Sequence, residues 1–573
     1  MHLNDALGHK DGLHCIYNHN EQGSAIAAEA YNRLTGKIAT ICVTSGPGGT
    51  NAITGVIGGW LDSIPMFILS GQVKREVTIW SVQELPLRQL GDQEFDIVHS
   101  VANMTKYAVM VTEPQDIAYH LEKAWFLCRN GRGGPVWLDI PLDVQGTQIE
   151  TGTLRHFDSV ECIDEVIPAV SIGLAREVLE KIQKAQAPLI LAGGGIHLSG
   201  AEEEFLRLVE KLQIPVVTAW NSTDILAFDN PLCIGMPGTL GTRPGNFAVQ
   251  NCDLLLSLGC RLNLRMIGYN KYDFAKNAYK IIVDIDENEL KKPTINPDIP
   301  VWADVKQFMN LLLEQPYEVS PVHVSWVQWC NDVKKAYPAV LESYHHLEGP
   351  VNPYVFMDEL FKVLKSDDIV VTGNGSACVV SFQAGAIKQG QRLFTNSGCA
   401  AMGYGLPAAL GVAVARKGKR VICLDGDGSI MMNIQEMATI SYNKLDICIF
   451  LLNNDGYHSI RQTQANLFKP PLVGVNKDNG VGFPDFKKLS EAFGFRYHRI
   501  ENEKMTDAVL KNVLSSRGPL LCEVMLDPSQ KFEPKSSSKV LSDGRIVSPS
   551  LDDMAPFLER DEFEKIRYFK NVR

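Results

Sequence analysis

The stretches RVICLDGDGSIMMN (420–433) and DICIFLLNNDG (446–456) decide the fold of this chain. Each contains a short apolar run typical of a buried strand, and the run leads into polar turn residues. With a helix between them, the two strands are expected to lie parallel in one sheet. The carboxyl ends of parallel strands share one edge of the sheet, so Asp427 and Asn454 are expected to meet there.

The residues at that edge suit a metal ion and a diphosphate. Gly426 and Gly428 let the backbone approach a diphosphate closely, and the helix from Ser429 offers free N–H groups at its positive end. Mg²⁺ prefers about six oxygen ligands. The predicted protein ligands are Asp427, Asn454 and the carbonyl of Gly456. D-G and N-D are also common turn signals, so either piece alone favours a plain turn, and only their order and spacing favour the site.

Two earlier blocks repeat the alternation of apolar strands and amphipathic helices. The expected strands are IATICV (38–43), MFILSG (66–71) and PVWLDIP (135–141) in the first block, and APLILAGGG (187–195), IPVVTAW (214–220), DLLLSLG (253–259) and KIIVDID (280–286) in the second. This pattern predicts an α/β fold of three doubly wound parallel-sheet domains. We expect the domains at 1–145, 170–315 and 350–530, followed by a tail at 531–573.

Composition excludes several classes of protein. The net charge of −11 gives no basic footprint for nucleic acid or an anionic membrane. The 13 cysteines are scattered without C-x-x-C spacing, which favours reduced thiols and a cytoplasmic protein. Apolar runs such as 448–452 are far shorter than the roughly 18 residues of a membrane span, and the chain start does not resemble a secretory signal.

Further motifs resemble those of thiamine-diphosphate-dependent enzymes, most closely the large subunits of acetolactate synthase (acetohydroxyacid synthase). Besides GDG and NN, they are EQG (21–23), TSGPGGTN (44–51), GRGGPVWLDIP (131–141) and MGYGLPAA (402–409), and the likeness covers nearly the whole chain. It implies a pyrimidine-binding, a central nucleotide-binding-like and a diphosphate-binding domain. It also implies thiamine diphosphate and Mg²⁺ as cofactors, and pyruvate or another 2-oxo acid plus a carbonyl acceptor as substrates. The family further implies a homodimer or homotetramer with active sites between subunits.

The resemblance assigns catalytic roles to residues of the first block. Glu21 matches the glutamate that holds a proton at the aminopyrimidine of the cofactor, work suited to a carboxyl group in an apolar pocket. Without the resemblance, Glu21 is an ordinary acid in the first turn of a helix. Gln93 takes the place of a glutamine that lines the substrate pocket, and a generic helix-facing polar pair with Glu94 is the alternative.

The resemblance also assigns cofactor contacts in the third block. Met402 matches the residue that wedges between the two rings of the cofactor, although core filling is the usual role of methionine. The carbonyl of Ala400 is expected to accept from the 4′-amino group. Gly375 and Ser376 lie on the diphosphate side, where Ser376-Ala377 replaces the usual Gln-His of the family.

The middle block falls where acetolactate synthases hold FAD, which has no redox role in the family's reaction. The expected contacts are Gly194, Gly195, Arg261, Arg265, Asp284 and Asp304. The usual R-F-D-D-R of the family is R-L-N-L-R (261–265) here, so contacts to the flavin ring stay open. An ADP-type ligand and an empty fold are the alternatives.

Three departures limit what the family implies. The chain begins inside the family pattern, so we expect one βα unit of roughly 30 residues to be lacking before Met1. Thr463 replaces a tryptophan that favours 2-ketobutyrate, which weakens a role in branched-chain amino acid biosynthesis. Leu142 replaces a lysine. These changes resemble acetolactate-synthase-like enzymes of polysaccharide gene clusters, which transfer an acetyl unit to a keto sugar.

Four functions therefore remain open at this point. The leading one is decarboxylation of a 2-oxo acid with transfer of the two-carbon unit to a carbonyl acceptor. Transfer to a keto sugar nucleotide is the second, and Arg461 would then grip an anionic acceptor unless it is a plain surface arginine. A simple decarboxylase that releases an aldehyde and a non-catalytic partner subunit complete the set.

Overall fold

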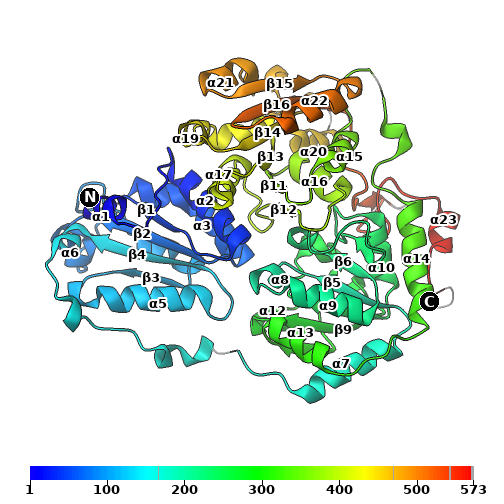
Figure 1. Cartoon of the computed structure of the whole chain (residues 1–573), viewed down its shortest axis with the longest axis horizontal. Helices are drawn as coiled ribbons and strands as arrows, with labels where there is room; N and C mark the ends of the chain where they lie inside the picture. The colour runs from blue at the N-terminus through cyan, green and yellow to red at the C-terminus, as the bar shows by residue number, and fades with distance from the viewer. Residues whose placement is uncertain (166, 347, 469, 541–543, 570–573) are drawn as a thin grey trace.

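The computed structural model describes residues 1–573 except 166, 347, 469, 541–543 and 570–573. Three parallel sheets with helices on both faces form three domains, which confirms the predicted fold class (Figure 1). In Figure 1 the first domain lies at the left, the third at the top and the middle one at the lower right.

The first sheet has four strands in the order β1-β2-β4-β3. Its strands are β1 (Thr40–Val43), β2 (Met66–Gln72), β3 (Tyr107–Met110) and β4 (Pro135–Pro141). Its helices are α1 (His2–His9), α2 (Glu21–Thr35), α3 (Pro47–Asp62), α4 (Ile97–Val101), α5 (Ile117–Arg129) and α6 (Leu142–Gly146). Alternate residues of β2 enter two separate cores, one on each face of the sheet. A strand buried on both faces has to be apolar throughout, as MFIL is.

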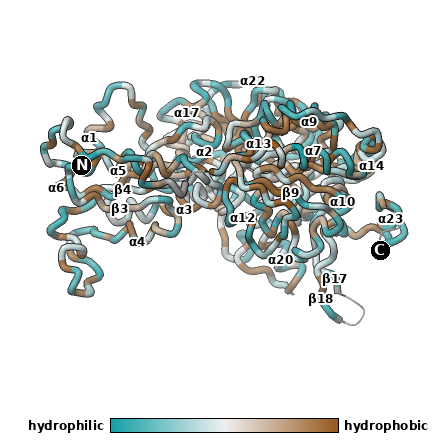
Figure 2. The backbone as a smooth tube through the Cα atoms, turned by 90° about the horizontal axis from the view of Figure 1, so that it is seen from below, coloured by the Kyte–Doolittle hydropathy of each residue, from teal (hydrophilic) through white to brown (hydrophobic). Residues whose placement is uncertain are grey.

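The middle sheet has six strands in the order β10-β9-β8-β5-β6-β7. The strands are β5 (Pro188–Ala192), β6 (Val216–Thr218), β7 (Cys233–Gly235), β8 (Leu254–Leu258), β9 (Tyr279–Asp284) and β10 (Ile299–Trp302). The helices are α7 (Ile172–Lys184), α8 (Gly195–Leu198), α9 (Glu202–Leu212), α10 (Arg243–Asn251), α11 (Leu264–Ile267), α12 (Glu287–Lys291) and α13 (Val305–Glu314). Figure 2 shows the hydrophobic strand β9 in brown inside this domain.

The third sheet has six strands in the order β12-β11-β13-β14-β16-β15. They are β11 (Ile369–Thr372), β12 (Arg392–Phe394), β13 (Val421–Gly426), β14 (Ile447–Asn453), β15 (Arg496–Ile500) and β16 (Leu520–Met525). The helices are α15 (Pro353–Val363), α16 (Ser376–Ala384), α17 (Gly405–Arg416), α18 (Asp427–Ile430), α19 (Glu436–Tyr442), α20 (His458–Leu467), α21 (Phe486–Ala492) and α22 (Glu503–Ser515). β13 and β14 are parallel neighbours, as the opening motif predicts.

Helix α2 joins the first domain to the third. One side of α2, with Ala25 and Ala28, enters the core of the first domain, whereas Ile26 and Ala27 enter the core of the third. The backbones of α2 and α17 approach closely, because a Cβ at Gly411 would lie 2.1 Å from the carbonyl oxygen of Ala27. Both views show α2 beside α17 (Figures 1 and 2). The segment that begins with Glu21 is therefore held between two domains.

The tail returns to the other domains. Helix α14 (His323–Ala336) lies between the middle and third domains in sequence, and α23 (Arg560–Lys565) ends beside it (Figure 1). Strands β17 (Lys539–Val540) and β18 (Ile546–Val547) form an antiparallel pair that projects from the body (Figure 2). Gln383 donates to the carbonyls of Pro534 (2.8 Å) and Leu240 (3.1 Å), so it ties the tail to two domains. Among the described helices, none is both long and apolar enough to cross a membrane.

Candidate cofactor site

Asp427 lies at the first position of α18, directly after β13. Its carboxylate accepts hydrogen bonds from the backbone N–H groups of Gly428 (2.8 Å) and Gly456 (2.7 Å). The side chain is buried, and burial raises the pKa of Asp427 to about 7. A cation beside this carboxylate would favour its ionised form. The structure thus brings Asp427 against the loop that follows β14.

Asn454 completes the pair at the end of β14. Its Nδ2 atom donates to the Ser376 hydroxyl at 2.8 Å, and its side chain is buried. Its Oδ1 atom is buried as well and accepts no hydrogen bond from the part of the chain that the structure describes. An unsatisfied buried acceptor is costly, and a metal ion would satisfy it. An amide oxygen beside a buried carboxylate therefore fits Mg²⁺.

Arg461 braces the loop that contains these ligands. Its guanidinium donates to the carbonyls of Asn454 (2.8 Å) and Asp455, and it lies 3.6 Å from the Asp455 carboxylate. Asp455 and Gly456 both have positive φ, 58° and 107°. A Cβ at Gly456 would lie 2.1 Å from the Val475 carbonyl oxygen, so this position requires glycine. Because the guanidinium binds residues 454–455, few of its N–H groups are left to bind an anionic acceptor substrate.

Two helix N-termini converge on the same place. Ser376 begins α16 and Asp427 begins α18, and the loop after β14 bonds to both, through the Asn454 side chain to Ser376 and through the Gly456 N–H to Asp427. A Cβ at Gly375 or Gly426 would meet nothing within 4 Å, so the backbone borders open space at both glycines. Helix N-termini beside open backbone form an anion site. This cradle fits a diphosphate.

The loop before α17 is strained where the resemblance expects cofactor contacts. Ala400 has φ 54°, a left-handed conformation that costs a residue with a Cβ roughly 1 kcal/mol or more. Asn374 donates to the Ala401 carbonyl at 2.7 Å, and the Ser429 hydroxyl accepts from the N–H of Gly403 at 3.0 Å. These bonds hold half-buried Met402 near the start of α18.

Glu21 lies in the first turn of α2, after the N-cap residue Asn20. Its carboxylate accepts a hydrogen bond from Asn51 Nδ2 at 3.1 Å. Asn51 belongs to α3, and a Cβ at Gly48 in that helix would lie 3.6 Å from Glu21 Oε1. The Glu21 side chain is half-buried. The motif TSGPGGTN therefore forms one wall around this carboxylate.

Gln93 borders the same wall from a different loop. It has φ 58°, its side chain is exposed, and its carbonyl oxygen would lie 2.4 Å from a Cβ at Gly46. Its neighbour Glu94 is buried and accepts from the N–H groups of Leu90 and Gly91 at 2.8 and 2.9 Å. Gln93 lies in a turn and Glu94 directly follows it, and the two side chains have different surroundings, one exposed and one buried. Glu94 fixes the loop, and Gln93 projects from it.

The two groups of residues come from different domains of the chain. Within the described part of the chain, no hydrogen bond or ion pair joins Glu21 or Gln93 to Asp427, Asn454 or Gly456. Groups of three or more His, Cys, Asp or Glu that could hold a metal are also lacking among the described residues. A metal site here therefore depends on the Asn454 amide and a backbone carbonyl.

A cavity of about 480 Å³ lies between the first and middle domains, and Arg392, Phe394 and Ser397 of the third domain also border it. All six residues expected to contact a nucleotide line it, namely Gly194, Gly195, Arg261, Arg265, Asp284 and Asp304. Asp284 is buried at the end of β9, and burial raises its pKa to about 6. Arg265 lies over the ring of Trp220, with 5.8 Å between the guanidinium carbon and the ring centroid.

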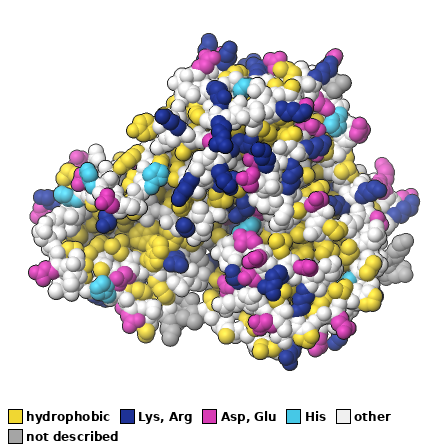
Figure 3. Space-filling model, in the orientation of Figure 1, with side chains coloured by type: hydrophobic (Ala, Val, Ile, Leu, Met, Phe, Trp, Pro, Cys, Tyr) yellow, Lys and Arg dark blue, Asp and Glu magenta, His cyan; other side chains and the backbone are white. Residues whose placement is uncertain are grey.

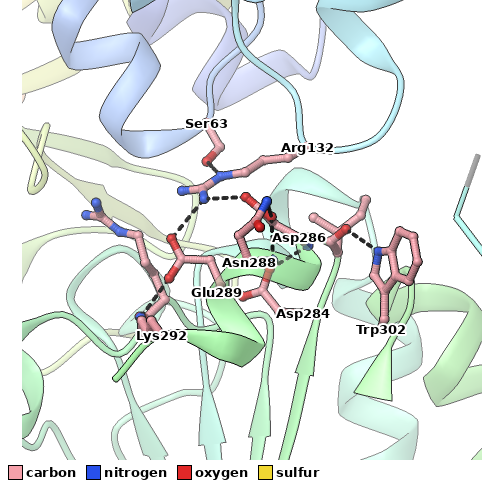
Figure 4. A network of polar contacts seen from close by, with 10 residues as sticks. Ser63, Arg132, Asp284, Asp286, Asn288, Glu289, Lys292 and Trp302 are labelled. Atoms are coloured by element: carbon pink, nitrogen blue, oxygen red, sulfur yellow. Dashed lines mark hydrogen bonds and ion pairs between the residues drawn. The ribbon is translucent and has the colours of Figure 1, made fainter. Parts of the chain in front are cut away.

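Arg132 closes this cavity from the first domain. Its guanidinium lies 3.0 Å from the Asp286 carboxylate and 2.8 Å from that of Glu289, both in the middle domain (Figure 4). Lys292 also pairs with Glu289 at 2.7 Å and donates to the carbonyl of Arg261. The wall of the cavity is therefore connected across the domain boundary by ion pairs.

Sequence reasoning missed several polar residues of these two sites. Asp425 precedes Asp427 by two residues, is fully buried, and has a pKa that burial raises to about 7. A Cβ at Gly373 would lie 2.1 Å from its Oδ1, so glycine makes room for it. Asp425, Asn51 and Arg132 all lie inside the motifs LDGDG, TSGPGGTN and GRGG. Because they lie within motifs already assigned to the site, these three residues could have been predicted as site residues.

Known protein families match parts of all three domains. Three protein-family models match, all described as parts of a thiamine pyrophosphate enzyme: the N-terminal TPP binding domain at 1–99, the central domain at 175–312 and the C-terminal TPP binding domain at 373–524.

Individual relatives are similar along most of the chain. A probable acetolactate synthase large subunit of Methanococcus aeolicus is 33% identical over 551 residues, which cover 92% of this chain and 87% of that protein. The acetolactate synthase large subunit of Lactococcus lactis is 32% identical, covering 95% of this chain and 91% of its own length. The acetolactate synthase isozyme 1 large subunit of Escherichia coli K12 is 31% identical, covering 92% and 90%.

Proposed function

The chain belongs to the thiamine pyrophosphate enzymes of the acetolactate synthase type, and on that premise we propose how its residues perform the reaction. It is a thiamine-diphosphate-dependent carboligase that decarboxylates pyruvate and joins the two-carbon unit to a second carbonyl compound. When bound, thiamine diphosphate supplies the nucleophilic carbon and the electron sink. The residue assignments rest above all on the buried, unsatisfied Oδ1 of Asn454, two residues before the Gly456 N–H that bonds to the Asp427 carboxylate.

The diphosphate half of the site consists of Gly375, Ser376, Asp427, Asn454 and Gly456. Asp427, Asn454 and the carbonyl of Gly456 would hold Mg²⁺, and the N-termini of α16 and α18 would hold the diphosphate, with Gly426, Gly428 and Ser429 beside them. Met402 would support the cofactor between its rings, and the carbonyl of Ala400 would accept from its 4′-amino group. The strained φ of Ala400 supports this role, since strain is retained where geometry matters.

The pyrimidine half of the site consists of Glu21, Asn51 and Gln93. Glu21 would hold a proton at the aminopyrimidine, with Asn51 fixing the orientation of its carboxyl group at 3.1 Å. Gln93 projects from a loop fixed by Glu94 and would line the substrate pocket. Glu21→Gln is the direct test, since turnover should be lost while thiamine diphosphate still binds.

A second copy of the chain would complete the active site, which makes a homodimer the smallest active unit. Glu21 is half-buried and Gln93 is exposed, and the loop before Gln93 exposes Leu85, Leu87 and Leu90. Figure 3 shows a hollowed face on which hydrophobic side chains gather between the first and third domains. Contiguous exposed apolar surface marks interfaces. Sedimentation velocity should give a dimer or tetramer, and an active monomer would contradict this proposal.

The cavity between the first and middle domains would hold FAD without a redox role. Its six expected contacts converge on one cavity of about 480 Å³, a volume within the range of cofactor sites. The absorption spectrum of the purified protein, before and after unfolding, tests this assignment. Release of ADP in place of a flavin would identify an ADP-type ligand, and release of neither would leave an empty fold.

The thirteen free cysteines support a reducing, cytoplasmic location.

A keto sugar nucleotide is the second candidate acceptor, and Thr463 favours it. The Thr463 side chain is exposed, and its hydroxyl donates to the Ser459 carbonyl of its own helix at 2.9 Å. No bulky wall therefore stands at this position, which leaves room for an acceptor larger than 2-ketobutyrate.

Product analysis by mass spectrometry separates the remaining functions. The protein is incubated with pyruvate alone, with pyruvate and 2-ketobutyrate, and with pyruvate and a 4-keto sugar nucleotide. Acetolactate or an acetylated sugar is expected. Acetaldehyde without any ligated product would indicate a simple decarboxylase. Calorimetry with thiamine diphosphate and Mg²⁺ tests the non-catalytic alternative, which tight binding with turnover would exclude.

A further inference from the structure

Glu436, from the third domain, reaches the segment that leads into Glu21. It begins α19 and is fully buried. Its Oε1 atom accepts from the backbone N–H groups of His19 and Asn20, both at 3.2 Å. Its Oε2 atom accepts from Asn18 Nδ2 at 2.8 Å, and from the Thr439 hydroxyl at 2.8 Å. Three consecutive residues directly before Glu21 thus bind one carboxylate.

Four donors account for the burial of this charge. A buried carboxylate is costly unless it is hydrogen-bonded, and these donors supply the bonds. Glu436 also lies beside the N-terminus of the 15-residue helix α2, where the helix dipole favours negative charge. The carboxylate and the N-cap residue Asn20, which accepts from Gln22 N–H at 2.8 Å, together fix the first turn of α2.

Gly23 makes room for this carboxylate. A Cβ at position 23 would lie 2.7 Å from Glu436 Oε1 and 2.9 Å from Cδ. The surrounding backbone is ordinary helix, so glycine is not needed there for its conformation. Gly23 serves the close approach of Glu436, and any larger residue would displace the carboxylate.

The first and third domains are also held together by contacts that do not involve Glu436. Helices α2 and α17 already pack through Ala27 and Gly411, and Glu29 accepts from the Tyr404 hydroxyl at 2.8 Å two turns further along α2. Glu436 is distinguished by its position, since it binds only at the end of α2 that presents Glu21.

We propose that Glu436 is a positioning residue that fixes segment 18–20 and thereby holds the Glu21 carboxyl group in place for the cofactor. This inference rests on the proposed function of Glu21. Asp427 lies nine residues earlier in the same run of α18 and α19. One short run of the third domain therefore carries a predicted metal ligand at its start and the support of the catalytic glutamate at its end.

The test uses Glu436→Gln, with Glu29→Gln as the matched control for loss of a buried interdomain carboxylate. Two quantities are measured: the rate at which the C2 proton of bound thiamine diphosphate exchanges with solvent, and amide hydrogen exchange of residues 16–24 in the protein without cofactor. The first should fall about 10- to 100-fold in Glu436→Gln, because a displacement of about 1 Å can cost that much. Amide exchange at 18–20 should rise, and the affinity for thiamine diphosphate should stay unchanged.

Exchange of partners provides the rescue. Asn18→Asp alone places two carboxylates against each other, and Glu436→Gln alone leaves a single amide oxygen to accept from the four donors that the Glu436 carboxylate binds. The double variant restores an amide donor facing a carboxylate, so it should recover most of the C2 exchange rate. A merely structural role predicts no such recovery of rate.

The positioning role of Glu436 and the proposed function fail on different results. If Glu436→Gln does not fold, Asn18→Ala and Gly23→Ala replace it, because each loosens the same contact from the first domain and should slow C2 exchange. Normal C2 exchange in these variants, or an equal loss in Glu29→Gln, would overturn the positioning role. A wild-type protein that neither binds thiamine diphosphate nor exchanges its C2 proton would overturn the proposed function instead.

Discussion

The two halves of the site differ in how completely one chain builds them. In the diphosphate half, Asp427 and Asn454 are 2% and 6% exposed and joined to neighbouring elements by hydrogen bonds. In the pyrimidine half, Glu21 is half-buried with Asn51 as its bonded partner, and Gln93 is exposed.

This difference follows from the elements that carry the residues. Asp427 and Asn454 follow neighbouring strands β13 and β14, whose register fixes their separation. Glu21 begins a helix, and Gln93 lies in a loop with positive φ. The comparison implies that the diphosphate half determines cofactor affinity and that the pyrimidine half determines the rate. Variants in either half, assayed for both cofactor affinity and turnover rate, test this division of roles.

The largest effect is expected from Glu21→Gln. The amide cannot hold or deliver the proton, so turnover should fall about 10²- to 10⁴-fold, the range typical of a lost acid–base group. Affinity for thiamine diphosphate should remain within a few-fold, because the diphosphate half is untouched. Steady-state kinetics and calorimetry measure the two quantities. Glu210→Gln, an exposed position on α9 of the middle domain, is the control. Full activity in Glu21→Gln would refute the catalytic assignment.

Asp427→Asn should mainly weaken cofactor binding, whereas Glu21→Gln should mainly slow turnover. Loss of the carboxylate removes the charge that holds Mg²⁺, so the affinity for Mg²⁺ and thiamine diphosphate should fall at least about 100-fold, more than the loss of a merely orienting group. High cofactor concentration should restore part of the turnover. Calorimetry and a cofactor titration of activity check this. Unchanged affinity would move the metal site elsewhere.

The diphosphate half could be predicted from the sequence because its signals are local. Strand, turn and helix lie within a few residues, and the rule for parallel strands brings Asp427 and Asn454 together. The six expected nucleotide contacts came instead from the resemblance to acetolactate synthases, and all six line one cavity. Short or polar strands were missed, including β15 (RYHRI), because they lack an apolar run.

The long-range contacts could not be predicted from the sequence. Glu436 and Asn18 are 418 positions apart, and Arg132 and Asp286 are 154 apart. No periodicity or turn signal connects such positions, because their meeting depends on how whole domains pack. The hydrogen bond from Arg461 to the Asn454 carbonyl could not be predicted either, because it depends on the path of the loop between them.

Asp139 permits a test of the pyrimidine half through pH. It is buried, and it accepts from Ser70 at 2.5 Å and from Gln72 at 3.0 Å, whose amide also donates to the Phe95 carbonyl beside Gln93. Burial raises its pKa from 3.8 to about 7. The folded state therefore binds this proton more tightly, and the stability it contributes is present below about pH 4 and lost as pH rises through 7.

Asp139→Asn should remove that part of the pH dependence. An amide can donate to Ser70 and accept from Gln72, so the hydrogen bonds survive. Between pH 5 and pH 8 the wild-type protein should lose on the order of 1–3 kcal/mol more stability than the variant. Urea unfolding of the cofactor-free protein at several pH values measures the difference. Parallel pH curves for the two proteins would show that Asp139 stays ionised in the folded state.

The smallest effect is expected from Thr463→Trp, which asks whether the diphosphate half also chooses the acceptor. Thr463 is exposed on α20, two residues after the arginine that braces the metal loop, so a larger side chain should fold without loss of stability. The indole would restore the apolar surface that favours 2-ketobutyrate in the family. Preference for 2-ketobutyrate over pyruvate should rise about 10-fold, as expected for one added hydrophobic contact. Thr463→Val is the control, because it removes the hydroxyl without adding bulk. Competition between the two acceptors measures the ratio. An unchanged ratio with normal turnover would place acceptor choice in the pyrimidine half, beside Gln93, and would reverse this part of the comparison.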